Sequence, residues 1–532
     1  MSLAERLTTG TLADLVRLQA ETHPLATALV SEGRVWPYEG LQRGIMRLAL
    51  MLSDGGVTQG ERVLLMAPTC DSFVVSFFAL VRLGAIPVPL NPNLLEVEVI
   101  AHARDCHARL LLADSSVSET VREAFIRACD GRVIGLDPRR QQVTWHYESG
   151  QAPPISYFDL AYDAAPEVPL DPTAIAAILY TSGTTGAPKG VCLTHRNLLS
   201  NARAIADVLP VARYSTSAVT LPLHHASGLT GQLLTTLMVG GTAHLFRNLA
   251  FPFPVLAQIQ REAIEGFAAF PATFRQLAAV SALNELDLSC VRYLSIAGSP
   301  LALEDLTLIR QIFPRARVYL GYGLTEAGPR VATLSEQDSH FFAGSVGRPL
   351  PGVSLKVVVD GREADPDEVG ELWVKGPGVM TSYWNNPLES SRVLEDGWLR
   401  TGDRARLDAE GYLFVMGRRE HLVATTGEKL SPTEIEVVLE RHPKVREAAV
   451  VAVPDSVLGE RLVACVVPIN GSVDAQDTHR HCERHLARHK IPHEFRVIDR
   501  LPKTKSGRVQ RDRLRAWCMD GAPAEVDPRA EL

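Results

Sequence analysis

The most informative stretch of the chain reads Tyr180-Thr181-Ser182-Gly183-Thr184-Thr185-Gly186-Ala187-Pro188-Lys189-Gly190. An apolar run from Ala174 to Tyr180 precedes it and predicts a strand that leads into this loop. Its glycines let backbone N–H groups approach oxygen atoms closely, its hydroxyls donate further hydrogen bonds, and Lys189 supplies a positive charge. We therefore predict a loop that binds polyphosphate. Composition alone also leaves a surface turn open, and the pattern is not a Walker A motif, because no Ser or Thr directly follows Lys189.

Strand-like and helix-like segments alternate on both sides of this loop. The runs Arg62–Met66 and Ala218–Leu221 predict strands, whereas Leu12–Thr22 and Leu198–Val208 predict helices. Such alternation is typical of an α/β architecture.

The pattern changes from Val346 onward, where strand-like segments are separated by turn dipeptides such as Asp360-Gly361 and Asp396-Gly397. These signals predict a β-rich subdomain over about 346–418. Beyond Glu420 the chain has its own strand and helix pattern, including a predicted helix over His479–His489. We therefore expect an N-terminal domain over 1–418 and a C-terminal domain over 419–532.

Composition excludes several classes of protein. The chain has 532 residues, of which 46% are hydrophobic and 22% charged, as in a soluble globular enzyme. A formal net charge of −7 gives no global electrostatic reason to bind nucleic acid or an anionic membrane. The apolar stretch from Phe73 to Leu90 is interrupted by Arg82 and two prolines, so no membrane span is expected. The start lacks a signal-peptide pattern, and the 8 cysteines form no CxxC pair. We expect reduced thiols and a cytoplasmic location.

The phosphate-binding stretch resembles the corresponding loop of the adenylate-forming family, which includes acyl-CoA synthetases, nonribosomal adenylation domains and luciferases. The match is closest to the acyl-CoA synthetases, and further motifs extend it over residues 12–514. The resemblance implies an N-terminal AMP-binding domain of two α/β subdomains and the β-rich subdomain, followed by a small, mobile α+β domain. It also implies that the phosphates of ATP are held by Thr181, Lys189, Ser182, Gly183, Thr184, Thr185 and Gly186.

The stretch Leu221-Pro222-Leu223-His224-His225-Ala226-Ser227-Gly228-Leu229 resembles the family motif beside the carboxylate pocket. The resemblance implies that His225 orients the acid or gates its pocket. His224 stands where the family has an aromatic residue. Apart from the family, two histidines after a strand form a satisfied, partly buried pair more often than a catalytic one.

The segments Ser295–Leu301 and Gly321–Glu326 resemble those that form the adenine pocket and meet the α-phosphate. The resemblance implies that the backbone of Gly323 and of residues 298–300 passes close to the base, that Tyr322 stacks on it, and that Thr325 donates to phosphate. Glu326 is implied as a carboxylate ligand of Mg²⁺. Without the family, a Thr-Glu pair is more often a helix cap. The residues assigned to the adenine pocket are Gly298, Ser299, Pro300, Tyr322 and Gly323.

The remaining matches concern the ribose, the hinge and the C-terminal domain. Asp403, within Gly397–Asp403, is implied to accept hydrogen bonds from both ribose hydroxyls. Arg418 lies in the stretch Gly417–Glu420 that resembles the hinge, and it is implied to reach ribose or phosphate. Gly427, Glu428 and Lys429 resemble the loop that enters the site for thioester formation. Arg508 stands where the family has a lysine that contacts the carboxylate and the α-phosphate during adenylation.

The resemblance implies an AMP-forming acyl-CoA synthetase that uses ATP, Mg²⁺ and coenzyme A. A substrate carboxylate attacks the α-phosphorus, pyrophosphate leaves, and a thiol then takes the acyl group. Two alternatives stay open: an acyl-AMP ligase that loads a separate carrier protein, and a thioesterifying enzyme that uses pre-formed acyl-AMP because of Arg508. A binding protein that has lost turnover is a rival from another class. Nothing in the sequence sets the oligomeric state.

The substrate and a histidine-rich segment are less constrained by the sequence. The region from His225 to Phe270-Pro271-Ala272 has small and apolar residues and no acid placed to hold an α-ammonium, so we expect a non-amino carboxylic acid in a mainly apolar pocket. Cys482, His485 and His489 share one face of the predicted helix and could bind zinc. We favour a solvated polar helix, because no second ligand pair at zinc spacing occurs elsewhere.

Overall fold

The computed structural model forms two compact units. One contains residues 1–92, 98–181 and 189–419, and the other contains residues 93–97, 182–188 and 420–532. The structure describes residues 6–7, 9–137, 142–147, 150–151, 155–156, 168–181, 188–212, 215–247, 252–270, 273–274, 277, 280, 283–297, 301, 303–341, 344–418, 423–425, 428–430, 432–455, 458–469, 473–503 and 509–520. Each unit is described by itself below.

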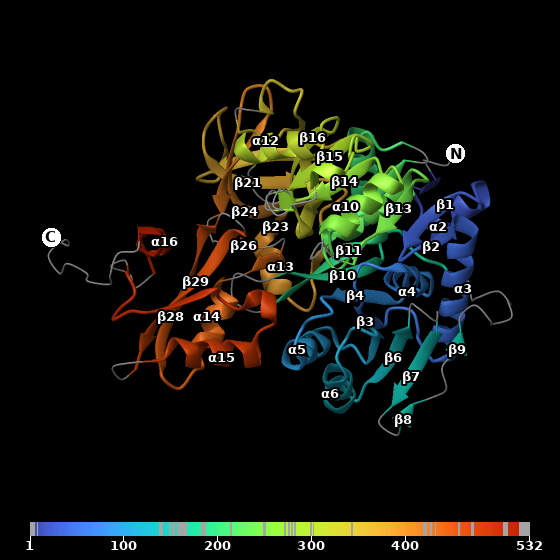
Figure 1. Ribbon diagram of the computed structural model, residues 1–532, viewed down its shortest axis with the longest axis horizontal. Coiled ribbons are helices and arrows are strands. Elements are labelled where there is room, and N and C mark those ends of the chain that lie inside the picture. Colours follow the sequence, from blue (N-terminus) through green and yellow to red (C-terminus); the bar gives the residue numbers. More distant parts are fainter. Residues whose placement is uncertain are drawn as a thin grey trace. The chain divides into compact units, whose positions relative to one another are not determined.

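A nine-stranded sheet forms the centre of the larger unit, in the order β18-β17-β16-β15-β14-β12-β13-β1-β2 (Figure 1). Its parallel part comprises β12 (Thr216–Val219), β13 (Thr242–Leu245), β14 (Gly266–Ala269), β15 (Tyr293–Ala297) and β16 (Arg317–Leu324). Antiparallel β17 (Gly328–Ser335) and β18 (Arg348–Pro349) extend one edge. At the other edge β1 (Thr27–Ser31) pairs parallel with β13, and β2 (Arg34–Pro37) is antiparallel to β1.

Helices cover both faces of this sheet, and the period of two along its strands decides which side chains meet which helix. On β15, Tyr293 packs in a cluster with Ile205 of α7 (His195–Val208). Leu294, the next residue, packs with Leu256 of α10 (Pro252–Arg261) and Ile309 of α12 (Leu303–Ile312). The mixed strand and helix order confirms the predicted α/β class.

A second, seven-stranded sheet contains the last part of the apolar stretch Phe73–Leu90. Its parallel strands are β3 (Arg62–Met66), β4 (Ile86–Leu90), β5 (Leu110–Asp114) and β6 (Arg132–Asp137). The apolar stretch itself forms α4 (Asp71–Arg82) and β4, and Phe73, Phe77 and Phe78 are fully buried. The segment is therefore part of a protein core. None of the helices in the described part of the chain has the length and apolarity that crossing a bilayer requires.

A hairpin of β10 (Ile175–Thr181) and β11 (Lys189–Thr194) brackets the predicted phosphate loop. β22 (Ser382–Tyr383) pairs with β11 and adds a third strand. The next sheet carries the predicted β-rich region, and its strands are β19 (Ser354–Val359), β20 (Arg362–Glu363), β21 (Gly370–Lys375), β23 (Leu394–Glu395), β24 (Trp398–Leu407) and β25 (Leu413–Arg418). Asp360 and Gly361 both have positive φ, of 48° and 82°, which is what a tight hairpin turn needs.

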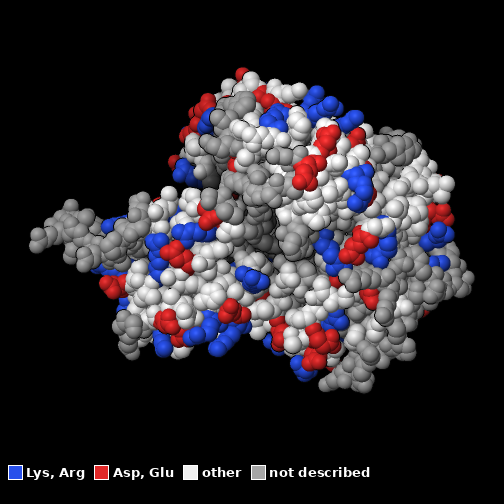
Figure 2. Space-filling view, in the orientation of Figure 1, with Lys and Arg blue, Asp and Glu red and all other residues white. Residues whose placement is uncertain are grey.

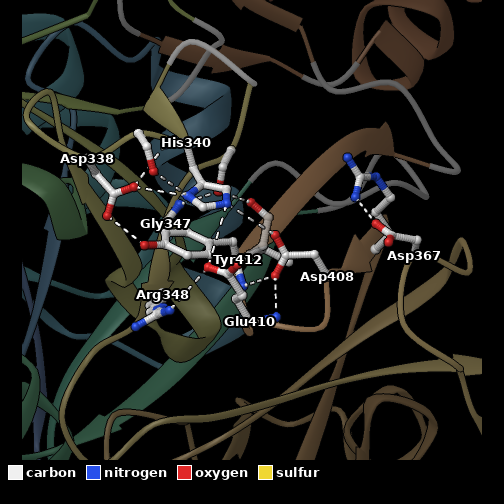
Figure 3. Close-up of polar contacts among 12 residues, drawn as sticks. Asp338, His340, Gly347, Arg348, Asp367, Asp408, Glu410 and Tyr412 are labelled. Carbon is white, nitrogen blue, oxygen red and sulfur yellow. Dashed lines mark hydrogen bonds and ion pairs between the residues drawn. The ribbon is translucent and has the colours of Figure 1, made fainter.

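A polar cluster ties the β24–β25 hairpin to the segment after β17 (Figure 3). The Tyr412 hydroxyl donates to Asp338 Oδ2 at 2.7 Å, and the His340 ring stacks on Tyr412 at 3.8 Å between ring centres. The Arg348 guanidinium lies over the Tyr412 ring, with its central carbon 4.4 Å from the ring centre. Asp408 accepts from the Tyr412 backbone N–H at 2.8 Å and closes the turn. The cluster holds the turn of a hairpin whose other end bears Asp403.

The smaller unit is an α+β fold around β28 (Val445–Asp455), β29 (Gly459–Pro468) and β30 (Glu494–Val497). α14 (Pro432–Glu440), α15 (Ala475–His485) and α16 (Arg511–Asp520) pack on this sheet through Leu439, Cys482 and Leu514. The prediction of one helix over His479–His489 is wrong at its end. α15 stops at His485 because Leu486 takes an extended conformation, with ψ 142°, and is buried.

Charged side chains of both signs are mixed over the described residues on the face shown in Figure 2. This is in keeping with the modest net charge of the chain, −7.

Candidate active site

The two ends of the predicted phosphate loop face each other in the β10–β11 hairpin. Thr181 and Lys189 are the last pair of its register. The Lys189 ammonium lies 3.6 Å from Glu389 Oε2 of α13 (Pro387–Val393) and 5.3 Å from the centre of the Tyr383 ring. Both side chains of this ion pair are mostly buried, with 13% and 18% exposed. The hairpin thus holds the lysine at the base of the loop, and a carboxylate and an aromatic ring hold its side chain.

Tyr383 connects this lysine to the candidate metal ligand. Its hydroxyl donates to Glu326 Oε1 at 3.0 Å, and the Met380 backbone N–H donates to the Glu326 carbonyl at 2.8 Å. Glu326 and Thr325 belong to a short 3₁₀ helix, Thr325–Ala327, that directly follows β16. The residues predicted for phosphate and for metal therefore converge on one tyrosine.

Asp403 and Tyr322 meet as a second polar pair in the same unit. The Tyr322 hydroxyl donates to Asp403 Oδ2, and the Asp403 backbone N–H donates to Thr401 Oγ1 at 3.1 Å. Asp403 is 5% exposed, so this carboxylate is held rigidly at the sheet. The β24–β25 register places Arg418 opposite Asp403, which brings the backbones of these two predicted nucleotide-binding residues together.

His224 and His225 lie in the turn after β12, with their ring centres 4.4 Å apart. A short helix, Ala226–Gly228, and a π-helical turn, Leu229–Leu234, follow directly. Gln232 fixes this turn to β12, because its side chain accepts from the Leu221 N–H at 3.0 Å and donates to the Ala218 carbonyl at 2.9 Å. A Cβ on Gly228 would lie 2.2 Å from the Pro222 carbonyl oxygen, so this close approach requires glycine. π turns often occur at functional sites.

Several predicted site residues fall outside the described residues: Ser182, Gly183, Thr184, Thr185, Gly186, Gly298, Ser299, Pro300, Gly427 and Arg508. For Arg418, Glu428 and Lys429 only the backbone is described, in β25 and in β27 (Glu428–Leu430). Their roles stay predictions.

The metal-binding potential of the described residues is limited. No group of three or more His, Cys, Asp or Glu side chains in the described part of the chain is placed to hold a metal ion. His489 lies in a separate 3₁₀ helix, Arg488–Lys490, so it does not continue the face of α15 that bears Cys482 and His485. Glu326 fits a different mode, in which Mg²⁺ is bound by one or two carboxylates and by the phosphates of its nucleotide.

Tyr383 and Glu389 were not predicted from the sequence. They are about 190 residues beyond the loop that they contact, and no local pattern marks either of them. Tyr383 could have been placed beside Lys189 only by predicting that β22 pairs with β11. That pairing is hard to predict, because β22 has just two residues, Ser382–Tyr383.

Comparison with known proteins places these observations in a family. A model described as "AMP-binding enzyme" matches residues 16–384, and one described as "AMP-binding enzyme C-terminal domain" matches residues 434–508. A feruloyl-CoA synthase from Amycolatopsis sp is 33% identical, over 93% of this chain and 97% of the relative. A 2-succinylbenzoate–CoA ligase from Bacillus subtilis is 31% identical, over 93% and 96%.

Solved structures agree with these sequence matches. An o-succinylbenzoate CoA synthetase from Bacillus subtilis, bound with a product analogue, superposes with a TM-score of 0.83 at 30% identity, covering 94% of this chain and 98% of that one. The amide bond synthetase McbA from Marinactinospora thermotolerans superposes with a TM-score of 0.81 at 26% identity, covering 97% and 99%. The predicted resemblance to adenylate-forming enzymes is confirmed, and the chain belongs to the AMP-binding enzyme family.

Proposed function

We propose that this chain is an AMP-forming acyl-CoA synthetase, an acid–thiol ligase that activates a non-amino carboxylic acid with ATP and transfers it to coenzyme A. The observation that carries the proposal is the convergence of Lys189 and Glu326 on Tyr383. The ligase activity is supported by relatives above 30% identity that are CoA ligases over more than 90% of this chain.

In the first half-reaction, an oxygen of the substrate carboxylate attacks the α-phosphorus of ATP and pyrophosphate leaves. Because the carboxylate attacks directly, the protein positions the reactants and stabilises charge. Lys189, Thr181 and residues 182–186 hold the leaving phosphates, and Thr325 donates to the α-phosphate. Glu326 would hold Mg²⁺, and the ion would supply positive charge that neutralises the phosphates. Lys189 must leave Glu389 to reach a phosphate. Before ATP binds, Glu389 and Tyr383 hold the Lys189 ammonium beside the site.

Asp403 fixes the nucleoside. As a carboxylate it accepts from both ribose hydroxyls, and the Tyr322 hydroxyl already donates to one of its oxygens. Tyr322 therefore orients Asp403 in addition to its proposed stacking on adenine. The backbone of Gly323 and residues 298–300 completes the base pocket, and Arg418 reaches ribose or phosphate from the end of β25.

In the second half-reaction, a thiol attacks the acyl carbon and AMP leaves. The C-terminal domain, residues 419–532, rotates between the two steps and brings Arg508 in for adenylation and Gly427, Glu428 and Lys429 in for thioester formation. His225 orients the acid or gates its pocket. The acceptor we favour is free coenzyme A, and a carrier-protein thiol is the alternative. The 8 free cysteines are in keeping with a cytoplasmic location.

The test is to incubate the purified chain with MgATP, coenzyme A and a panel of carboxylic acids. We expect acid-dependent release of pyrophosphate and formation of acyl-CoA, each measured separately. Pyrophosphate release without acyl-CoA, together with transfer to an added carrier protein, would identify an acyl-AMP ligase. Acyl-CoA formed only from supplied acyl-AMP would identify a thioesterifying enzyme. ATP binding without either product would refute the proposal.

A further inference from the structure

Arg330 is a buried cation within the nine-stranded sheet. Its side chain is 4% exposed. The guanidinium donates to Thr333 Oγ1 at 2.6 Å, to Ser295 Oγ, and to the Leu320 carbonyl at 3.5 Å. All three acceptors are neutral. Burial lowers the pKa of Arg330 to about 10, so the side chain is still protonated at neutral pH.

No carboxylate balances this charge among the described residues. Tyr293 is the one ionisable group there that acts on it, and burial raises the pKa of Tyr293 to about 12, so Tyr293 is neutral. Other partly buried arginines of the chain are paired: Arg34 lies 2.8 Å from Asp71, and Arg511 lies 2.5 Å from Glu436. A buried charge without a partner is costly, so its retention calls for an explanation.

A β-bulge gives Arg330 its direction. Tyr322 pairs with Ala332 and Leu324 pairs with Gly328, so residues 329–331 of β17 stand opposite Gly323 alone. Bulges of this kind re-aim a side chain and are frequent beside active sites. The guanidinium then lies against Gly321, where a Cβ would be 2.7 Å from Cζ. Glycine at this position leaves the room that the guanidinium occupies.

The guanidinium still has donors to offer. Leu320 and Thr333 accept the two Nη1 hydrogens, Ser295 accepts one on Nη2, and Nε has no acceptor among the described residues. A guanidinium has five N–H groups, so Nε–H and one Nη2–H remain. These two lie on one edge of the planar group, which is the arrangement that binds both oxygens of a carboxylate.

This cation lies near the predicted nucleotide segments, all within the larger unit. Gly321, which it contacts, directly precedes Tyr322, and Ser295, which it binds, is two residues before Ala297. Neighbouring residues of a strand point to opposite faces, so Arg330 lies behind the strands whose front carries Tyr322.

We propose that Arg330 binds a second carboxylate on the acid substrate, and that the enzyme therefore activates dicarboxylic acids. The inference rests on the proposed function and narrows its substrate class. It also revises the expectation of a mainly apolar pocket, because one buried cation sits at its proposed far end. The substrate's second carboxylate pairs with Arg330 in the way that the Glu436 carboxylate pairs with Arg511.

The experiment compares linear dicarboxylic acids with monocarboxylic acids of equal chain length, using acid-dependent pyrophosphate release. In the wild type we expect kcat/KM for the preferred diacid to exceed that of its matched monoacid by about 100-fold, the scale of a desolvated charge pair. Arg330→Met should abolish this ratio, and Arg330→Lys, which keeps the charge without the planar fork, should retain about a tenth of it. Arg203→Met, a partly exposed arginine of α7, is the matched control and should leave the ratio unchanged.

A second readout is the rise in Tm when the diacid is added without ATP, which should vanish in Arg330→Met. A wild type that prefers monoacids throughout, or an unchanged ratio in a folded Arg330→Met, overturns the inference while pyrophosphate release still supports the proposed function. If no acid releases pyrophosphate but the diacid stabilises the wild type through Arg330, the proposed function fails and the binding site stands. If Arg330→Met does not fold, Arg330→Lys decides, and a ratio equal to the wild type's overturns the inference.

Discussion

Lys189 and Arg330 are both largely buried cations of the larger unit, but only Lys189 has a carboxylate partner among the described residues. Lys189 lies beside Glu389 and over the Tyr383 ring, whereas Arg330 contacts neutral oxygens only. A ligand that binds Lys189 replaces an existing ion pair, so it gains only the difference between two interactions. A ligand that binds Arg330 gains the whole interaction, because no ion pair with a described residue is lost.

The difference between Lys189 and Arg330 matches the times for which their proposed ligands, pyrophosphate and the far end of the acid, stay bound. Pyrophosphate must leave after the first half-reaction, and a lysine that can return to Glu389 releases it more readily. The far end of the acid stays bound through both half-reactions, and an unpaired arginine holds it throughout. The two regions therefore lead to separate predictions about turnover and about substrate preference.

The largest effect is expected from Glu326→Gln, which removes the carboxylate charge that the Tyr383 hydroxyl contacts and that is proposed to hold Mg²⁺. Acyl-AMP formation should fall by about 1,000-fold, the upper range for loss of one group that stabilises the transition state. Folding should change little, because Gln can still accept from the Tyr383 hydroxyl. Single-turnover adenylation measures the effect, with Glu363→Gln on exposed β20 as the control. Adenylation near the wild-type rate would contradict the role of Glu326.

Asp403→Ala tests the front of the strands whose back carries Arg330. ATP affinity should fall by about 30-fold, since charge-assisted hydrogen bonds to the ribose are lost and the Tyr322 hydroxyl loses its acceptor. The preference between diacid and monoacid should not change, because Arg330 faces the other way. Calorimetric titration with ATP measures the affinity. An affinity equal to that of the wild type would refute the ribose contact.

Arg508→Lys should have an intermediate effect, because it restores the residue that the family uses at this position. We expect acyl-AMP formation from acid and ATP to rise by about 10-fold, and thioester formation from supplied acyl-AMP to stay nearly constant. Gly427→Leu is the matched variant, and its bulk should block the pantetheine path while adenylation continues. Assays of the separate half-reactions measure both. A fall in adenylation in Arg508→Lys would mean that arginine is the adapted residue here.

Local sequence patterns predicted much of the fold. Leu12–Thr22 and Arg62–Met66 match α2 and β3 at both ends, because the period of their apolar residues decides these elements locally. The helix predicted to reach His489 ends at His485 instead, because Leu486 turns into the core of the smaller unit. Packing between distant residues thus overrode a local pattern.

The candidate site was predictable where a motif carries it and unpredictable where strand pairing does. Asp403 and Glu326 were identified from their motifs. Glu389 reaches Lys189 only because β22 pairs with β11, and Arg330 is aimed at Gly321 only because of a bulge between β16 and β17. Neither the pairing nor the bulge leaves a mark in the local sequence.

The smallest effect is expected from Glu389→Gln, and it tests the comparison most directly. The variant removes the carboxylate that holds Lys189, while the amide fills the same space on α13. Lys189 then no longer has to give up an ion pair to bind phosphate, so KM for ATP should fall by about 3-fold. Pyrophosphate should leave more slowly, and product inhibition by pyrophosphate should strengthen by a similar factor.

Arg392→Gln is the matched control, because Arg392 contacts the same Glu389 oxygen at 3.7 Å but is 63% exposed and does not contact Lys189. It should leave both constants unchanged. A rise in KM for ATP in Glu389→Gln would mean that Glu389 positions Lys189 for phosphate, and the proposed exchange of partners at Lys189 would be wrong.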